Sequence, residues 1–250
     1  MNESDPQTPL VQRPNASAKR VECQFFWWTA AAIAIFVLIG FSRTYYFRSL
    51  FTMPDLSVFL HIHAAVMSGW IVLYLVQTTL VSARRVAAHR TLGTFGAGYA
   101  VLVVALGSTA TVLAAHREVQ GHTTFVYPTL IVLSLELTQM FLFAGLVAIS
   151  IWVRRRPDYH KRLLLLATLL MLPNVFARLL VNVHSNLPIL GIWTSLVAGL
   201  VVIDCIRGRK LHPAFAIGAA VVVLSMYLAY FVGITPLWQH AAARIVGALG

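Results

Sequence analysis

The chain has 250 residues, of which 59% are hydrophobic and only 11% are charged. Soluble domains are about 45–50% apolar and about 25% charged, so this composition excludes a soluble globular protein and favours an integral membrane protein. The formal net charge of +11 does not indicate a nucleic-acid-binding protein, because the basic residues are divided among short loops between apolar runs rather than gathered on one face.

Seven apolar stretches follow one another along the chain, and most reach the roughly 20 residues that a helix needs to cross a bilayer. Continuous apolar runs without period-two alternation indicate helices rather than barrel strands. We therefore expect an all-α fold, a polytopic membrane helical bundle of about seven transmembrane helices. The predicted spans are residues 25–41, 58–82, 91–115, 128–153, 163–182, 187–206 and 214–233.

The domain organisation follows from these spans. Residues 1–24 are polar and are expected to form a disordered cytoplasmic tail. Residues 25–233 form the seven-helix transmembrane domain, in which residues 58–182 are the working bundle. Residues 234–250 are expected to form a short outer C-terminal tail.

The distribution of basic residues predicts the orientation. The N-terminal segment and the loops after the second, fourth and sixth spans carry fourteen Lys and Arg residues, whereas the other loops and the C-terminal segment carry four. Basic residues accumulate in cytoplasmic loops, so we expect a multi-pass protein of the inner (plasma) membrane with its N-terminus in the cytoplasm. Membrane lipids are its expected surroundings.

The second predicted span carries a stripe of polar and aromatic residues. They fall at helical spacings of four, seven, eleven and fourteen from the first, and therefore share one face. Such a face would suit a flat macrocycle, a quinone ring or a metal, although packing in the bundle core explains it equally. The residues are His63, Met67, Trp70, Tyr74 and Gln77.

Two charged residues lie within predicted spans. Glu136 falls in the fourth span and Arg178 in the fifth, at similar depths from the outer surface. Charged groups inside a membrane are costly and are functional candidates, so an ion pair between them is predicted, with a purely structural pair as the alternative. Pro173 predicts a kink in the fifth span. His184, on the outer side, is grouped with His63 as a candidate metal ligand, because imidazole is a common axial ligand of haem.

A repeated signature precedes the third and fifth spans. In each copy an Arg pair is followed by a His four residues after its second Arg, Arg85 to His89 and Arg156 to His160, and the copies are 71 residues apart. Both His residues are expected in or beside loops. One interpretation is topology with contact to lipid headgroups; the other is half of a cofactor site or a docking surface for an anionic partner. The second candidate cluster is His89, Arg90 and His160.

Several of these residues together resemble a family of uncharacterised bacterial multi-pass membrane proteins, a domain of unknown function. They are His63, Gln77, the run His-Arg-Thr-Leu-Gly at 89–93, and His160 followed eighteen residues later by Arg178. That family is distinguished by a His-Arg-x-Leu-Gly turn, and the likeness covers residues 58–182. It implies residues that matter but no established activity. More loosely, the chain resembles b561-type cytochromes and haem-A-synthase-like proteins, in which His residues of neighbouring spans hold haem b.

The leading functional hypothesis is a redox-associated membrane protein that binds haem b between helices two to five, with a quinone or copper as other candidate ligands and a quinone or redox protein as partner. In it, His63 and His184 are the expected ligands, Arg178 neutralises an anionic group, and Glu136 orients that group or moves protons. The alternatives are a proton-coupled transporter and an assembly or scaffold protein without a catalytic site. The sequence does not decide whether the protein is an enzyme.

Overall fold

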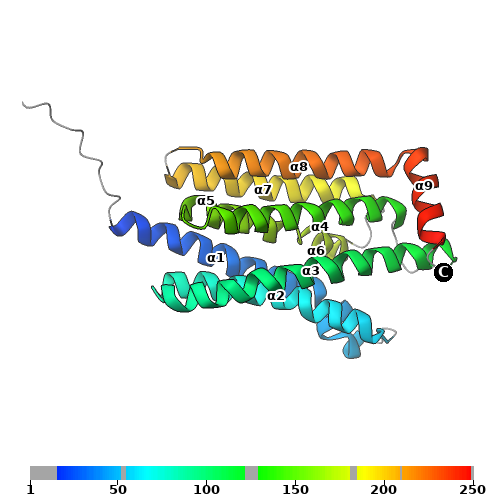
Figure 1. The fold of residues 1–250 in the computed structure, drawn as a ribbon, viewed down its shortest axis with the longest axis horizontal. Coiled ribbons are helices and arrows are strands. Elements are labelled where there is room, and N and C mark those ends of the chain that lie inside the picture. The colour runs from blue at the N-terminus through cyan, green and yellow to red at the C-terminus, as the bar shows by residue number, and fades with distance from the viewer. Residues whose placement is uncertain (1–15, 52–54, 122–128, 181–184, 209, 249–250) are drawn as a thin grey trace, which may run out of the picture.

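The computed structural model describes residues 16–51, 55–121, 129–180, 185–208 and 210–248. These residues form a bundle of long helices that run alternately up and down, with no strand among them (Figure 1). Within these ranges, seven helical segments are long and apolar enough to cross a membrane. Large apolar side chains such as Phe141 and Leu224 are exposed on the sides of the bundle, where lipid would cover them. The prediction of an all-α polytopic membrane bundle is confirmed.

The observed helices match the predicted spans in number and order, and the second span has the predicted bounds. The polar ends of several helices extend beyond the apolar run, because residues such as Ala, Arg and Glu continue a helix outside the hydrocarbon layer. Two short helical turns, Ser42–Tyr46 and Arg48–Phe51, follow the first helix. The helices are α1 (Ala16–Phe41), α2 (Val58–Ser82), α3 (Val86–Val119), α4 (Thr129–Trp152), α5 (Pro157–Leu169), α6 (Pro173–Leu179), α7 (Asn186–Gly208), α8 (Pro213–Gly233) and α9 (Pro236–Gly247).

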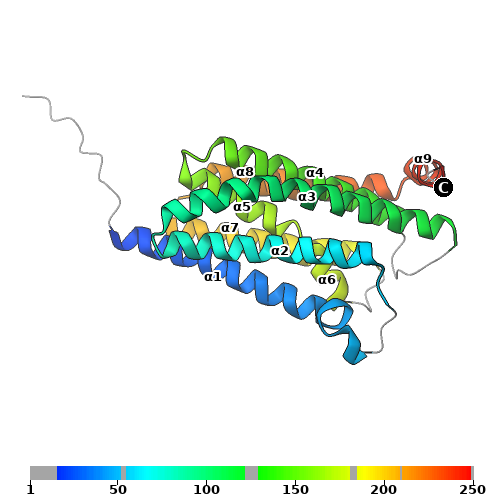
Figure 2. The same cartoon turned by 60° about the horizontal axis from the view of Figure 1, so that its bottom comes forward.

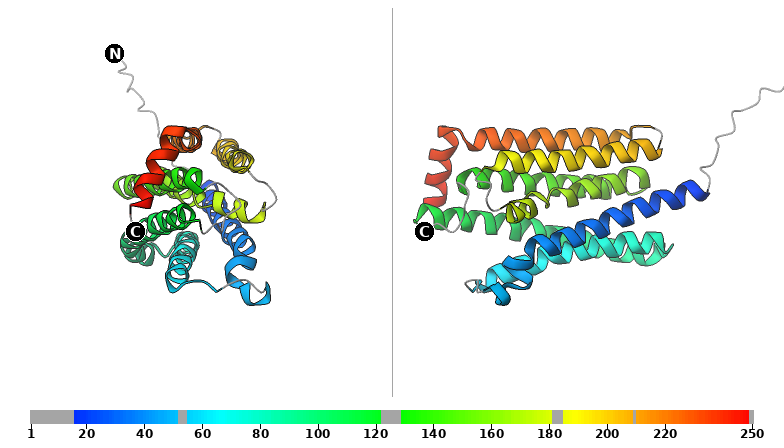
Figure 3. Two further views of the ribbon diagram at one scale, coloured as in Figure 1. Left: turned by 90° about the vertical axis from the view of Figure 1, so that its right-hand side faces the viewer. Right: turned by 180° about the vertical axis from the view of Figure 1, so that it is seen from behind.

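Both predicted tails contain helix. Residues 16–24 belong to α1, and the C-terminal segment forms α9, which lies across one end of the bundle (Figure 3). The helix α9 is held by its own side chains: Trp238 Nε1 donates a hydrogen bond of 2.7 Å to Leu130 O, and Val246 is buried against the end of α3. His116 Nδ1 of α3 donates to Val246 O at 2.9 Å. These contacts explain why the segment is not a free tail.

The fifth span lies at the centre of the bundle. Helix α4 packs against α3, α5 and α8, whereas α1 crosses the bundle obliquely beside α2 (Figure 2). Leu165, Leu166 and Leu170 of the fifth span have no exposed surface. The fifth span therefore contacts protein on nearly all sides, and lipid contact falls mainly to the other helices.

A proline interrupts this central span, as the sequence predicted. Helix α5 ends at Leu169 and α6 begins at Pro173. In an uninterrupted helix the N–H of residue 173 would donate to Leu169 O, but proline has no N–H. Trp193 of α7, which is fully buried, supplies a substitute: its Nε1 donates to Leu169 O at 2.8 Å. The indole is therefore a second donor to Leu169 O, which also accepts a hydrogen bond of 3.1 Å from Leu172 N.

An ion pair joins α5 to α7 near one end of the bundle. Arg162 Nε and Nη2 donate to the two carboxylate oxygens of Asp204, each at 2.8 Å, and both side chains are 6% exposed. Arg162 Nη1 also donates to Asp158 O at 3.0 Å. From the sequence, Arg162 is expected in a loop, and Asp204 is not among the candidate functional residues. Both ends of this bidentate pair are satisfied, so it fixes the register of two helices.

His212, in the loop between α7 and α8, gives the structure a dependence on pH. Its ring lies 4.8 Å from that of Tyr159, and its Nδ1 is buried without a hydrogen-bond partner among the described residues. Burial, and then the positive charge of Arg162, lower the pKa of His212 from its ordinary value of 6.5, against an opposing effect of Asp158 and Asp204. The folded protein therefore resists protonation of this ring.

We expect protonation of His212 to destabilise the fold. The unfolded chain binds this proton more readily, so the contribution to the free energy of unfolding is complete above the ordinary pKa of His and is lost as the pH falls through the lowered pKa of folded His212. The measurement is the difference in melting temperature between wild type and His212→Phe at each pH. As the pH falls, the melting temperature of wild type should decrease relative to that of His212→Phe. Parallel curves would show that His212 does not contribute.

Candidate functional site

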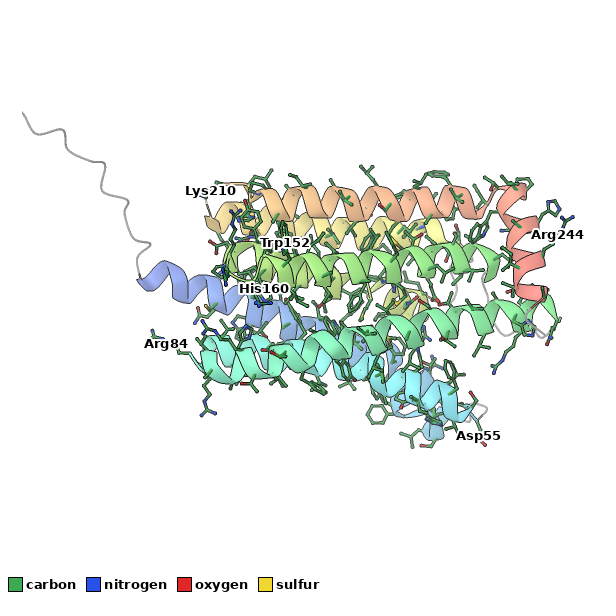
Figure 4. The ribbon with its side chains drawn as sticks, viewed as in Figure 1. Asp55, Arg84, Trp152, His160, Lys210 and Arg244 are labelled. Atoms are coloured by element: carbon green, nitrogen blue, oxygen red, sulfur yellow. The ribbon has the colours of Figure 1, made fainter. Side chains whose placement is uncertain are left out.

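The described parts of the chain place the candidate residues in two regions at different depths of the bundle. Figure 4 shows His160 at the same end as Arg84, Trp152 and Lys210, with Asp55 and Arg244 at the other end. We call the first the basic end, because the turns at 83–85 and 153–156 carry five Arg residues there. We call the other, which carries α9, the opposite end.

In the first region, α2, α3 and α4 approach closely. His63 Nδ1 donates a hydrogen bond of 3.3 Å to Leu106 O of α3. A Cβ atom on Gly107 would lie 2.5 Å from Met140 Sδ and 3.3 Å from Met67 Cε. The approach therefore depends on the absence of a side chain at Gly107, and Met67 serves here as packing between helices.

Glu136 and Arg178 do not form the predicted ion pair. Glu136 Oε2 accepts a hydrogen bond from Thr111 Oγ1, and no nitrogen of Arg178 lies within ion-pair distance. Arg178 instead donates to Asn174 O at 3.3 Å, and its guanidinium lies 4.3 Å from the ring centroid of Phe41. The break at Pro173 separates α6 from α5, so depth counted along one straight helix did not give the direction of Arg178. The two charges remain within electrostatic range.

A small cavity, lined by six apolar and four polar residues, lies beside Glu136 between α4, α6, α7 and α8. Its volume is about 40 Å³, room for a few water molecules but not for a macrocycle. Gln139 lines it with 2% of its surface exposed and has no hydrogen-bond partner among the described residues. The remaining polar lining consists of Asn174 and Asn186.

The α2 stripe is divided between regions. Trp70 belongs to the core: its Nε1 donates to Thr168 Oγ1 at 3.3 Å, and its ring lies 4.8 Å from that of Phe143. Tyr74 is also buried, and its hydroxyl has no partner among the residues described. Gln77 contacts His89 at the basic end. One helical face therefore serves packing in its middle and polar contacts at both ends.

The second region is the histidine pair, His89 and His160. Each is the fourth residue of its helix, α3 and α5, so both lie in the first helical turn, beside a loop as the sequence predicts. The preceding Arg85 and Arg156 are the N-cap residues, and each His N–H donates to the carbonyl of its Arg at 3.1 Å. The repeated signature is therefore a helix start used twice. It brings the two imidazoles to 6.4 Å between ring centroids, at an angle of 82°.

Hydrogen bonds orient both rings of the pair. His160 Nδ1 donates to Ser150 O at 2.9 Å. The amide of Gln77 accepts from Gly93 N at 2.8 Å and donates to His89 Nδ1 at 2.5 Å and to His89 O at 3.2 Å. In this orientation the proton of neutral His89 is on Nε2, and that of His160 is on Nδ1. The exposed Arg90 adds a positive charge that reaches His89.

The predicted partner of His63 lies outside the described residues, because His184 falls in the range 181–184. Within the described part of the chain, no group of three or more His, Cys, Asp or Glu residues is arranged to hold a metal ion. Thr111, which donates to Glu136, was not predicted from the sequence as a site residue. Nor was Ser150, whose carbonyl accepts from His160. Asp204 could have been predicted, since an ionisable residue inside a predicted span is a functional candidate.

The chain matches no model of a protein family, and no curated protein or solved structure is similar to it. The geometry of the two regions is therefore the basis of the function proposed below.

Proposed function

We propose that this integral membrane protein is redox-associated and binds haem b at its basic end, where His89 and His160 would hold it. The observation that supports the proposal most directly is the separation of 6.4 Å between the two ring centroids. Metal–nitrogen bonds of about 2 Å place two imidazoles on opposite sides of one metal at roughly 6 to 7 Å between centroids. The histidine pair has the spacing that a single iron atom requires.

The hydrogen bonds of His160 fit a metal ligand, whereas those of His89 have to rearrange. A metal-bound His usually donates its other ring N–H to a carbonyl or carboxylate, which fixes the ring and the tautomer. His160 does so to Ser150 O, which leaves Nε2 as its metal-binding atom. For His89, binding through Nε2 requires the Gln77 amide to turn by 180°, so that its oxygen accepts from Nδ1–H. The two atoms are already within hydrogen-bond distance.

The surroundings suit an anionic cofactor. Arg90 and the arginines of the adjacent turns supply positive charge beside the pair, and guanidinium groups bind carboxylates such as haem propionates in bidentate fashion. Bound haem b would supply one-electron transfer. The residues of the protein would hold the haem, neutralise its propionates and exclude water. By the positive-inside rule the basic end is cytoplasmic in the inner membrane, and a quinone or a redox protein is the partner of this chemistry.

The proposal predicts the visible absorption of the purified protein. Wild type expressed with a supply of haem should show b-type bands that sharpen on reduction. Both His89→Ala and His160→Ala should abolish the bis-His spectrum. Gln77→Leu should weaken haem affinity by about 10- to 100-fold, the usual effect of removing a partner of a metal-binding His. His63→Ala, which leaves the pair intact, is the matched control and should retain the bands.

Two results would contradict this assignment. Colourless wild-type protein that takes up no added haem would remove the proposed function. Bands that survive both pair substitutions but disappear in His63→Ala would place the ligands in the other region. The melting temperature of each variant separates loss of ligand from loss of fold.

A further inference from the structure

The cavity beside Glu136 combines polar groups that have no partner in the protein. The Gln139 side chain is almost completely buried, with 2% of its surface exposed. Its amide forms no hydrogen bond with any described residue. A buried amide without a partner costs about 1–3 kcal/mol, so such groups are normally bonded to protein or to water. The volume of about 40 Å³ exceeds the roughly 10–15 Å³ that one water needs. Water in the cavity would therefore satisfy Gln139.

The Thr111 hydroxyl serves Glu136 in both of its protonation states. Thr111 Oγ1 lies within hydrogen-bond distance of Glu136 Oε2 and of Gly107 O, the latter at 3.1 Å. A hydroxyl has one proton to donate and accepts in return. It donates to Glu136 when that carboxyl is ionised. When the carboxyl is protonated, Thr111 Oγ1 accepts a hydrogen bond from the carboxyl O–H and donates its own proton to Gly107 O.

Few charged groups lie near Glu136 in the described part of the chain. Arg178 of α6 is the charged group whose field reaches the carboxyl, and His63 of α2 in turn interacts with Arg178. Thr111 of α3 faces the carboxyl as a neutral group, and the cavity lining from α7 and α8 carries no titratable side chain.

The cavity is placed to exchange water with the opposite end. Asn186, which lines it, is the first residue of α7, and Glu136 lies in the first half of α4, so both belong to the end that carries α9. Pro173 at the helix break lines it as well. Interrupted backbone at membrane depth is tolerated where it lines a cavity or is buried in protein. The half-buried Asn186 is therefore the polar lining residue nearest to that end of the bundle.

We propose that this cavity is a hydrated proton-binding site, in which Glu136 takes up a proton from, and returns it to, water at the opposite end of the bundle. The ligand is a proton carried by cavity water, and the Glu136 oxygen is the atom that binds it. Gln139 holds the water beside the carboxyl. This site does not depend on the histidine pair or on haem.

Infrared spectroscopy of the purified full-length protein in lipid nanodiscs tests the site. Wild type should show a carbonyl band of a protonated carboxyl that changes with pH and shifts on transfer to D2O. Glu136→Gln should remove this band; it preserves the size of the side chain and an acceptor for Thr111. The exposed Asp55 gives the control, because Asp55→Asn should retain the band. A band that remains in Glu136→Gln would overturn the proposal.

A second variant tests the role of cavity water. Gln139→Leu should slow the D2O shift of the Glu136 band while leaving the band itself in place. A wild-type band that never shifts in D2O would show a carboxyl sealed from solvent and would also overturn the proposal. Because neither measurement involves haem, failure here leaves the proposed function standing, and a colourless protein leaves this test intact.

Discussion

Replacing Asp204 with Asn is expected to lower the free energy of unfolding by about 3–5 kcal/mol. The reason is the burial of its partner: Arg162 is 6% exposed and directs two hydrogen bonds of 2.8 Å at the Asp204 carboxylate. The substitution removes the negative charge to which two Arg162 donors point, in a site that water hardly reaches. Titration with SDS in mixed micelles, followed by circular dichroism, measures the change.

The exposed pair nearby is the matched control for this substitution. Lys161 and Asp158 form an ion pair of 2.8 Å in which the Asp158 side chain is 60% exposed. Asp158→Asn should therefore cost less than about 1 kcal/mol. The double variant Arg162→Met, Asp204→Leu should be more stable than the sum of its single changes predicts, because neither charge is then left alone. Additive effects, or an Asp204→Asn variant as stable as wild type, would mean that the pair does not hold α5 to α7.

Trp193→Phe is expected to lower the free energy of unfolding by about 0.5–1.5 kcal/mol, the net contribution of one hydrogen bond, because Leu169 O keeps the bond of 3.1 Å from Leu172 N. Phe retains most of the apolar volume but cannot donate to Leu169 O, which Trp193 Nε1 contacts at 2.8 Å. Trp193→Ala should cost more, about 3–5 kcal/mol, since it also leaves a cavity around a fully buried site. The same detergent titration gives both values.

The proline break supplies the specific control. Pro173→Ala restores an N–H at the position from which a continuous helix would donate to Leu169 O. In that background Trp193→Phe should cost less than in wild type. The exposed Trp152, 83% accessible, should tolerate Phe without measurable loss. An equal cost of Trp193→Phe with and without the proline would show that packing, not the hydrogen bond, explains the effect.

The two contacts explain why the fifth span can be both central and broken. The Arg162–Asp204 pair holds α5 to α7 near the basic end, and Trp193 of α7 holds the chain where α5 ends. Helix α7 thus supports the fifth span on both sides of its apolar core. This support keeps Asn174 of α6 in the lining of the Glu136 cavity.

The sequence by itself determined that the chain is a seven-span membrane bundle. This conclusion depends on local properties, because a run of about 20 apolar residues must form a helix in lipid whatever its neighbours are. The same local rules identified Glu136, the kink at Pro173 and the repeated Arg–His signature. The helix start that repeats at His89 and His160 is local too, since Arg85 and Arg156 each stand four residues before the His.

Only the tertiary structure decided which polar side chains meet. Gln77 was grouped with His63 on one face of α2, but it contacts His89, and Arg178 points to Asn174 O and Phe41 rather than to Glu136. Arg162 meets Asp204 across 42 residues of chain. Such contacts depend on the rotation, tilt and pairing of whole helices, and hydropathy and spacing within one helix carry no information about its neighbour. The membrane-spanning segments could therefore be predicted from the sequence, whereas the side-chain contacts between them could not.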